Sequence, residues 1–204
     1  MLISVITTLY NYGNYIDDCI KSFLQQSLSM SEMIIVDDAS TDNPYKKIKK
    51  YKDYNIKYIK FTENKGYSAA KNAGIEASKS ELLVMLDADD MLTKNSLRVR
   101  FDEINKGFDF IHGPCLDLKE RKTSESKMWL KWKQYPVYKN VHAQSVMLKK
   151  DIHRKIGLYD ESLRCKSDRE MFARIFNHDF KIGSVSNYVA VYRLHERQMH
   201  KSKE

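Results

Sequence analysis

The sequence predicts a single-domain α/β fold in which a mixed, largely parallel sheet is flanked by helices. In the first half of the chain, short apolar runs rich in β-branched residues alternate with amphipathic stretches, which is the pattern of βα units. The 204 residues contain no internal repeat, no low-complexity linker and no hinge rich in glycine or proline. That length suits one domain with a substantial core.

Four strands and four helices account for this alternation. We expect strands at about 2–9, 32–37, 56–61 and 82–87, and helices near 14–27, 43–52, 67–79 and 93–106. The first helix is the clearest, because turn-forming residues at 11–14 precede apolar side chains that recur at helical spacing from Tyr15 to Leu24. One face of that helix should therefore pack on the sheet.

The second half of the chain has a different character. Trp129 and Trp132 lie among many lysines and arginines between residues 119 and 139. A strand-like segment at 141–148 and a helix from about 167 to 177 follow. We expect these segments to complete the same domain.

The chain carries a net charge of +8 and has a sequence pI near 9.2. Such a balance favours an anionic partner, for example a nucleotide, a nucleic acid or a phospholipid surface. The lysines at 46, 47, 49 and 50 are typical of an ordinary solvated helix face. Charge alone therefore does not choose among these partners.

Three cysteines are scattered through the chain without C-x-x-C or ligand-like spacing: Cys19, Cys115 and Cys165. An odd number with that spacing predicts neither a disulfide framework nor a zinc site, and a reducing compartment fits it. No apolar run approaches the roughly 20 residues of a membrane span, and the N-terminus has neither a basic leader nor a cleavage site. We therefore expect a cytoplasmic protein, with a peripheral position at a membrane as the alternative.

Polar and acidic residues follow three of the expected strands. The loops that contain them are residues 7–11, 37–42 and 87–90. In an open α/β sheet, ligands bind outside the carboxyl ends of the strands. These three loops are therefore the candidate site.

Carboxylates cluster in Asp87-Ala88-Asp89-Asp90, at the end of a buried strand. Like charges repel there, so the arrangement is costly without a cation. A Mg²⁺ or Mn²⁺ ion, which takes one or two carboxylates together with phosphate oxygens and water, would offset that cost. The alternative is helix capping, with Asp89 or Asp90 at the start of the helix near Thr93.

A nucleotide pocket is expected beside this cluster. The aspartates at 37–38 end a second strand, and Thr8 with Tyr10 ends the first. An Asp carboxylate can accept an N–H of a base, and a Tyr ring can stack on that base. For the second loop, a plain turn with a helix N-cap at Ser40 or Thr41 is the alternative.

Four motifs stand in order along the chain. They are Ser-Val-Ile-Thr-Thr-Leu-Tyr-Asn at 4–11, Val-Asp-Asp-Ala-Ser-Thr-Asp at 36–42, Asn-Lys-Gly through Lys-Asn-Ala-Gly at 64–74, and Leu-Asp-Ala-Asp-Asp at 86–90. In order and spacing they resemble glycosyltransferase family 2, whose fold is the Rossmann-like GT-A fold. The resemblance continues through Ile-Gly-Leu-Tyr-Asp-Glu at 156–161, similar to the family's Gly-Gly-Phe-Asp-Glu turn, and Ser-Asp-Arg-Glu at 167–170. It covers nearly the whole chain.

The resemblance implies roles at the matching positions of the first half. Thr8, Tyr10 and Asp38 would contact the nucleoside of a nucleotide-sugar donor, with Asp38 on the base. Asp87 and Asp89 would serve the ribose and the metal bound to the diphosphate, which is Mn²⁺ or Mg²⁺. The cluster of carboxylates would then be the centre of the donor site.

For the second half, the resemblance implies a catalytic base and a further metal contact. Asp168 matches the Asp of the family's Glu-Asp motif, the usual base of its inverting members, although Ser167 replaces the Glu. His195 resembles a late His that approaches the metal and the diphosphate, and His200 lies in the same basic tail. Lys71 replaces an Arg of the family and is expected in the nucleotide-sugar site. From the residues alone, Asp168 could instead cap the helix that follows it.

Together these features predict an inverting, metal-dependent glycosyltransferase that uses a nucleotide-sugar donor, with a UDP-sugar favoured. A base would remove the acceptor proton while the metal neutralises charge on the leaving diphosphate. Residues 1–92 would hold the donor, and residues 93–204 would bind the acceptor and supply the base.

The acceptor should be set by the basic and aromatic stretch from Lys119 to Lys139. Such a composition suits a lipid-linked sugar at an anionic membrane surface, and it also suits a nucleic-acid backbone with stackable bases. We expect a saccharide or lipid-linked glycan. The alternatives are a protein acceptor, DNA as the substrate of a viral enzyme that glycosylates hydroxymethylated bases, and a non-catalytic module that binds nucleotide or glycan.

Overall fold

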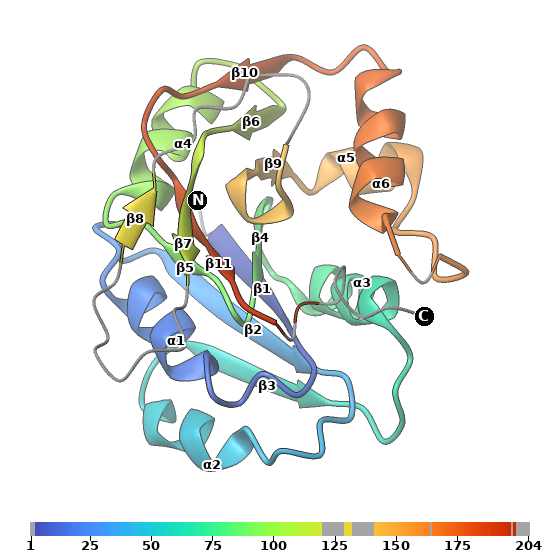
Figure 1. Ribbon diagram of the computed structural model, residues 1–204. Helices are drawn as coiled ribbons and strands as arrows, with labels where there is room; N and C mark the ends of the chain where they lie inside the picture. The colour runs from blue at the N-terminus through green and yellow to red at the C-terminus, as the bar shows by residue number, and fades with distance from the viewer. Residues whose placement is uncertain (1–2, 120–128, 132–140, 164, 197, 199–204) are drawn as a thin grey trace.

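The computed structural model describes residues 3–119, 129–131, 141–163, 165–196 and 198 (Figure 1). The four strands expected in the first half are confirmed to within a residue at each end. They are β1 (Ile3–Leu9), β2 (Ser31–Asp37), β3 (Ile56–Lys60) and β4 (Leu82–Asp87). The helices are α1 (Ile16–Leu24), α2 (Tyr45–Ile48) with the 3₁₀ turn η1 (Lys49–Tyr51), α3 (Tyr67–Ala77) and α4 (Ser96–Ile104).

The helix expected from residue 93 begins later, because the residues before it are paired elsewhere. They form the short strand β5 (Met91–Leu92), and the Thr93 hydroxyl donates to the Tyr188 carbonyl oxygen at 2.6 Å. The N-cap of α4 is Asn95. The alternative in which Asp89 or Asp90 caps this helix is therefore wrong.

The second half adds short strands and two helices. They are β6 (Phe110–His112), β7 (Cys115–Lys119), β8 (Trp129–Lys131), the 3₁₀ turn η2 (Ala143–Ser145), β9 (Met147–Lys149), α5 (Asp151–Ile156), α6 (Ser167–Phe176), β10 (Ile182–Ser184) and β11 (Ala190–Leu194). The strand expected over 141–148 is wrong for most of its length. The Ser145 hydroxyl donates back to the His142 carbonyl oxygen at 2.7 Å, which favours a tight turn over an extended strand.

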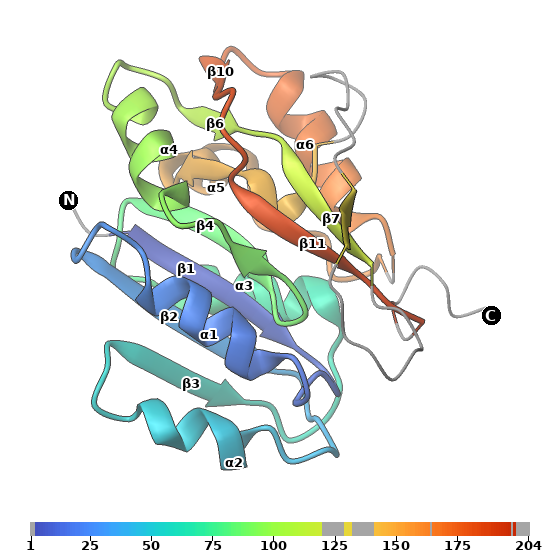
Figure 2. The ribbon, with the colours of Figure 1, turned by 60° about the vertical axis from the view of Figure 1, so that its left-hand side comes forward.

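The strands form two sheets, and helices lie on both faces of the larger one (Figures 1 and 2). The larger sheet has the order β10-β6-β9-β4-β1-β2-β3, and the smaller has the order β5-β11-β7-β8. In the larger sheet, β9 runs antiparallel between β4 and β6, while β4, β1, β2 and β3 are parallel. The predicted mixed, largely parallel α/β sheet is confirmed.

The register of the central strand β1 positions the candidate site. Thr8 is opposite Asp87 of β4, and Leu9 is opposite Asp37 of β2. Parallel strands in this register bring their carboxyl ends to one edge of the sheet. The three loops singled out from the sequence therefore meet there.

Side chains of β1 alternate between two apolar layers. Val5 packs in a cluster with Ile20 of α1 and Leu97 of α4, whereas Ile6 packs in a second cluster with residues of α3, α5 and α6. Gly74 lets α3 approach β1 closely, since a Cβ atom at that position would lie 2.3 Å from Ile6 Cγ2. The close approach fixes α3 against the strand whose end lines the site.

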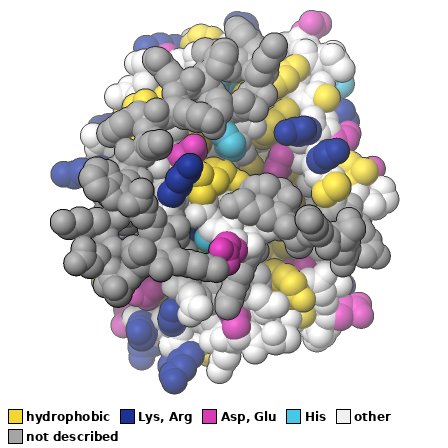
Figure 3. Space-filling model, in the orientation of Figure 1, with side chains coloured by type: hydrophobic (Ala, Val, Ile, Leu, Met, Phe, Trp, Pro, Cys, Tyr) yellow, Lys and Arg dark blue, Asp and Glu magenta, His cyan; other side chains and the backbone are white. Residues whose placement is uncertain are grey.

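Lysines gather over α2, at the lower edge of the face drawn in Figure 3. Lys46, Lys49 and Lys50 are exposed there, as a solvated helix face requires. Cys19 and Cys115 are buried free thiols. Of the helices that the structure describes, none has the length and apolar character that crossing a bilayer would need.

Candidate active site

Side-chain hydrogen bonds join the loops that follow β1 and β2. The Asn11 N–H donates to Ser40 Oγ at 2.9 Å, and the Thr41 N–H donates to Asn11 Oδ1 at 2.9 Å. The Gly13 N–H donates to Asp42 Oδ2 at 2.7 Å. Ser40 and Thr41 thus join two loops, and the alternative in which one of them caps a helix is wrong, since α2 has no side-chain cap.

The two carboxylates at the end of β2, Asp37 and Asp38, are buried and hydrogen-bonded. The Tyr58 hydroxyl donates to Asp37 Oδ2 at 2.5 Å. Asp38 accepts from the Lys65 N–H at 2.6 Å and from the Gly66 N–H at 2.9 Å. Because Gly66 is the N-cap of α3, Asp38 lies at a helix end whose backbone donors lack partners within the helix. The residue expected on the base therefore also organises the loop before α3.

Asp87 ends β4 beside the crevice. Thr8 Oγ1 donates to Asp87 Oδ1 at 3.0 Å, and the Tyr67 hydroxyl lies 2.9 and 3.1 Å from the two Asp87 carboxylate oxygens. Burial raises the pKa of Asp87 to about 6, although the nearby Lys71 charge opposes the shift. Tyr10, at the end of β1, is 47% exposed, so its ring is open to a ligand.

Asp89 lies against His195, which comes from the far end of the chain. His195 Nε2 is 3.0 Å from Asp89 Oδ2, and the His195 side chain is buried. The imidazole ring packs on Tyr12 and Tyr15, with ring centroids 5.5 and 4.7 Å away. The structure therefore brings two predicted metal ligands together. His200 lies outside the described residues.

Arg193 holds the end of β11 at the acidic loop. Its N–H donates to Asp90 Oδ1 at 2.8 Å, its Nε donates to the Asp89 carbonyl oxygen at 2.9 Å, and its Nη2 donates to Asp18 Oδ2 at 2.9 Å. Burial and the neighbouring carboxylates raise the pKa of Asp90 well above its usual range. Arg193 thus fixes the strand end that presents His195.

Asp168 lies in the first turn of α6, and its side chain points to α3. Lys71 Nζ forms an ion pair with Asp168 Oδ1, and the Tyr67 hydroxyl lies 3.2 Å from Asp168 Oδ2. The Lys71 ammonium group is buried between two rings, 4.1 Å from the Tyr67 centroid and 4.9 Å from the Tyr159 centroid. No side chain caps α6, so the alternative in which Asp168 serves only as an N-cap is wrong.

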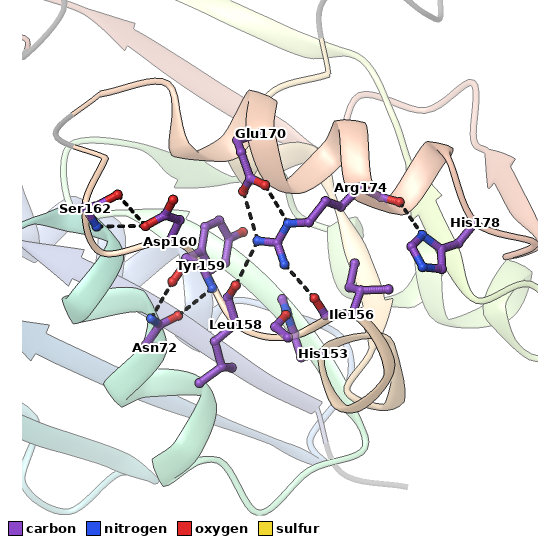
Figure 4. A network of polar contacts seen from close by, with 11 residues as sticks. Asn72, His153, Ile156, Leu158, Tyr159, Asp160, Ser162, Glu170, Arg174 and His178 are labelled. Atoms are coloured by element: carbon purple, nitrogen blue, oxygen red, sulfur yellow. Dashed lines mark hydrogen bonds and ion pairs between the residues drawn. The ribbon is translucent and has the colours of Figure 1, made fainter.

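Figure 4 shows the polar contacts that hold α6 near α3. Arg174 of α6 donates to the carbonyl oxygens of Ile156 at 2.7 Å and Leu158 at 2.8 Å. Asn72 of α3 donates to the Tyr159 carbonyl oxygen at 2.9 Å and accepts from the Tyr159 N–H at 2.9 Å. The turn after α5 is therefore held from both sides, which fixes the position of Asp168.

The Asp89–His195 pair fits a divalent metal that is shared with a diphosphate. Mg²⁺ and Mn²⁺ often take one or two protein ligands together with phosphate oxygens and water. Burial raises the pKa of Asp87, Asp89 and Asp90, so added positive charge would be stabilised here. The described residues contain no group of three or more His, Cys, Asp or Glu side chains placed to hold a metal, and Asp87, the other predicted ligand, is bonded to Thr8 and Tyr67.

Two residues of this site were not predicted from the sequence. Tyr67 contacts both Asp87 and Asp168, and Arg193 joins three acidic positions to β11. A signal for Tyr67 existed, since it stands four residues before Lys71 and therefore on the same helix face. Arg193 had no such signal, because its partners are remote in sequence. Most of the stretch at 119–139, expected to choose the acceptor, lies outside the described residues.

Comparison with known proteins gives a family and a fold. The family model described as "Glycosyl transferase family 2" matches residues 4–160. The putative teichuronic acid biosynthesis glycosyltransferase TuaG of Bacillus subtilis is 38% identical over 103 residues, which are 50% of this chain and 41% of TuaG. The Escherichia coli protein named UDP-Glc:alpha-D-GlcNAc-diphosphoundecaprenol beta-1,3-glucosyltransferase WfaP is 37% identical over 109 residues, 52% of this chain and 43% of WfaP. The matches thus span less than half the length of these two relatives.

Solved structures share the architecture at low sequence identity. Residues 1–349 of Staphylococcus aureus TarS in complex with UDP-GlcNAc align with a TM-score of 0.82 and 20% identity, over 100% of this chain and 62% of that TarS fragment. The mannosyltransferase PcManGT of Pyrobaculum calidifontis, in complex with GDP-Man and Mn²⁺, aligns with a TM-score of 0.78 and 15% identity, over 97% of this chain and 58% of PcManGT. The fold is therefore that of the GT-A glycosyltransferases.

Proposed function

This chain belongs to glycosyltransferase family 2, and we propose that it transfers a sugar, with inversion, from a nucleoside diphosphate donor to an acceptor hydroxyl. One observation carries the proposal. The Tyr67 hydroxyl lies within 3.2 Å of both Asp87 and Asp168, so the expected base stands one hydroxyl group away from the expected donor site. A pure binding module needs no carboxylate in that position.

In this proposal, residues 1–92 bind the nucleotide of the donor. Tyr10 would stack on the base, and Asp38 would accept a base N–H. Each Asp38 oxygen already accepts one backbone N–H, but a carboxylate offers about four lone-pair sites, so acceptor capacity remains. Asp87, which accepts a hydrogen bond from Thr8, would contact the ribose. We favour UDP, because WfaP is named for UDP-Glc and TarS was solved with UDP-GlcNAc.

The metal would be held by Asp89 and His195. The chemistry that Mn²⁺ or Mg²⁺ supplies when bound is neutralisation of the charge that grows on the leaving diphosphate. PcManGT, which was solved with Mn²⁺, supports a metal in this fold. His195, buried against Tyr12 and Tyr15, would approach the site as a fixed ligand.

Asp168 would be the base, within residues 93–204, which we assign to the acceptor. Its carboxylate is 26% exposed, so an acceptor hydroxyl can reach it, while Lys71 holds one of its oxygens. A single displacement at the anomeric carbon inverts that centre. The predicted place of Lys71 in nucleotide-sugar binding becomes, in this proposal, a contact with the base.

The acceptor we propose is a saccharide, either free or on a lipid-linked glycan. TuaG is named for teichuronic acid biosynthesis and WfaP for a sugar on diphosphoundecaprenol, and both names point to glycan acceptors. No observation on the described residues favours DNA. The distinction between acceptors depends on the second half of the chain, much of which lies outside the described residues.

A donor screen tests the proposal. Purified protein is incubated with UDP-, GDP-, CMP- and TDP-sugars and Mn²⁺, and release of the nucleotide is measured with and without excess EDTA. We expect release from one donor class, loss of that release in EDTA, and faster release when a lipid-diphosphate-linked saccharide is added. Full turnover in EDTA would contradict the proposed metal requirement. Acceleration only by hydroxymethylated duplex DNA would contradict the proposal that the acceptor is a glycan.

A further inference from the structure

Tyr67 stands between the two carboxylates on which the proposed reaction depends. Its hydroxyl oxygen is 2.9 Å from Asp87 Oδ1, 3.1 Å from Asp87 Oδ2 and 3.2 Å from Asp168 Oδ2. Tyr67 is the first residue of α3, directly after the loop that Asp38 organises. One phenol group thus contacts the donor side and the base side of the crevice.

The number of protons limits what this hydroxyl can do. A phenol has one O–H to donate, and an ionised carboxylate can only accept. The two shorter contacts go to Asp87, so the Tyr67 proton lies on that side. A lone pair of the Tyr67 oxygen then faces Asp168 Oδ2, and the contact at 3.2 Å joins two acceptors while Asp168 is ionised.

The ion pair with Lys71 determines which oxygen of Asp168 can take up a proton. Its ammonium group is held between the rings of Tyr67 and Tyr159 and pairs with Asp168 Oδ1. An ammonium group has only donors, so a proton that arrives on Asp168 is not placed on the oxygen that Lys71 holds. Oδ2, the oxygen beside Tyr67, is the one that receives it.

We propose that Tyr67 is a positioning residue for the base, whose hydroxyl oxygen accepts a hydrogen bond from Asp168 once the acceptor proton has been taken. This inference rests on the proposed function and deepens it. In the step, the acceptor O–H bond breaks and an Oδ2–H bond forms on Asp168. The acceptor oxygen bonds to the anomeric carbon, and the bond from that carbon to the diphosphate oxygen breaks with its electrons. The new Oδ2–H donates to Tyr67, which still donates to Asp87.

While Asp168 is ionised, its Oδ2 and the Tyr67 oxygen are two acceptors that repel each other. The negative charge on Oδ2 falls as the proton arrives, so this repulsion is relieved and the contact favours the transition state over the bound substrates. Interactions of that kind raise kcat and leave substrate binding unchanged. The contact of Tyr67 with Asp168 should therefore affect kcat, whereas its contact with Asp87 should affect donor affinity. The two contributions are separable.

A double-mutant cycle tests this. Tyr67→Phe is expected to lower kcat by up to about tenfold, the upper end of what one hydrogen bond between neutral groups contributes. In an Asp168→Asn background the same change should lower kcat little further, because the group that Tyr67 serves is gone. UDP affinity, measured by titration, reports separately on the contact with Asp87. Tyr51→Phe is the matched control, since it removes a hydroxyl that donates to Asp17 at 2.8 Å, outside the site.

The outcomes are distinct. A loss of kcat that disappears in the Asp168→Asn background supports the inference. An equal loss in both backgrounds, or wild-type kcat in Tyr67→Phe, overturns it and leaves the proposed function standing. A wild-type rate in Asp168→Asn alone overturns the assignment of the base, and the inference with it. Thermal unfolding of each variant, compared with Tyr51→Phe, shows whether a loss comes from a damaged fold.

Discussion

Asp89 Oδ2 and His195 Nε2 lie 3.0 Å apart, although 106 positions separate the two residues in the chain. The return of β11 beside the acidic loop makes this contact, and Arg193 fastens it through Asp89 and Asp90. The metal site that we propose therefore depends on β11 as much as on the loop after β4.

His195→Ala should therefore weaken the affinity of the protein for its metal. We expect the Mn²⁺ concentration for half-maximal activity to rise at least about tenfold, since loss of groups around a metal commonly costs that much affinity. His178→Ala is the matched control, because the His178 side chain is exposed and contacts the Arg174 carbonyl oxygen and the Phe180 ring, outside the site. If His195→Ala needs the same Mn²⁺ concentration as the wild type for half-maximal activity, His195 is not a metal ligand.

Lys71 should matter for turnover more than for nucleotide binding. Lys71→Met removes the charge that holds Asp168 Oδ1, and a misplaced base commonly slows a reaction tenfold or more. Lys71→Arg keeps the charge and restores the residue that the family usually has, so its loss should be smaller. Steady-state kcat and the UDP dissociation constant are measured for both variants. A loss of UDP affinity with unchanged kcat would show that Lys71 contributes to nucleotide binding, as the sequence predicts, and not to positioning the base.

Arg174 should contribute to stability through the turn that it holds. Arg174→Met leaves the carbonyl oxygens of Ile156 and Leu158 without that donor, which should lower the free energy of unfolding by about 2 kcal/mol. Arg154→Met is the matched control. Arg154 pairs with Glu81 on the surface, with both side chains 55% exposed, so its removal should cost less than about 1 kcal/mol. Equal losses in urea unfolding would contradict the assignment.

His153 should make stability depend on pH. Burial lowers its pKa from 6.5 to about 4 in the folded chain, and the structure gives its Nε2 no hydrogen-bond partner among the described residues. Below pH 6.5 the unfolded chain binds this proton first, so the free energy of unfolding falls as pH drops from about 6.5 towards about 4, by up to roughly 3 kcal/mol. His153→Gln cannot titrate. The difference between wild type and variant should shrink on acidification; a constant difference would contradict the burial argument.

The parallel half of the fold could be predicted from the sequence because its signals are local. The runs that became β1, β2 and β4 are apolar, those of β1 and β2 are rich in β-branched residues, and the polar residues that end them mark the edge where ligands bind. The short strands could not be predicted in this way. β6, β9 and β10 each have three residues, too few for a period to appear, and their pairing comes from tertiary contacts.

The same limit applied within the site. Asp38 and Asp168 could be chosen from their motifs, but their partners lie on other elements: Asp38 is held by the loop before α3, and Asp168 by Lys71, 97 positions away. Tyr67 resembles an ordinary first residue of a helix until the fold places Asp87 and Asp168 on either side of it. Sequence could therefore name the carboxylates and Lys71, but not which group positions which carboxylate.

We propose that Asp168 takes the acceptor proton in a nucleotide-sugar site. Asp168→Asn keeps the size of the side chain and removes its ability to act as a base, so the most direct measurement is the kcat of this variant beside its UDP dissociation constant. We predict that kcat falls about a hundredfold or more, which general-base catalysis commonly contributes, while UDP binds with wild-type affinity. A kcat near that of the wild type, with the fold intact, would contradict the account and place the base elsewhere.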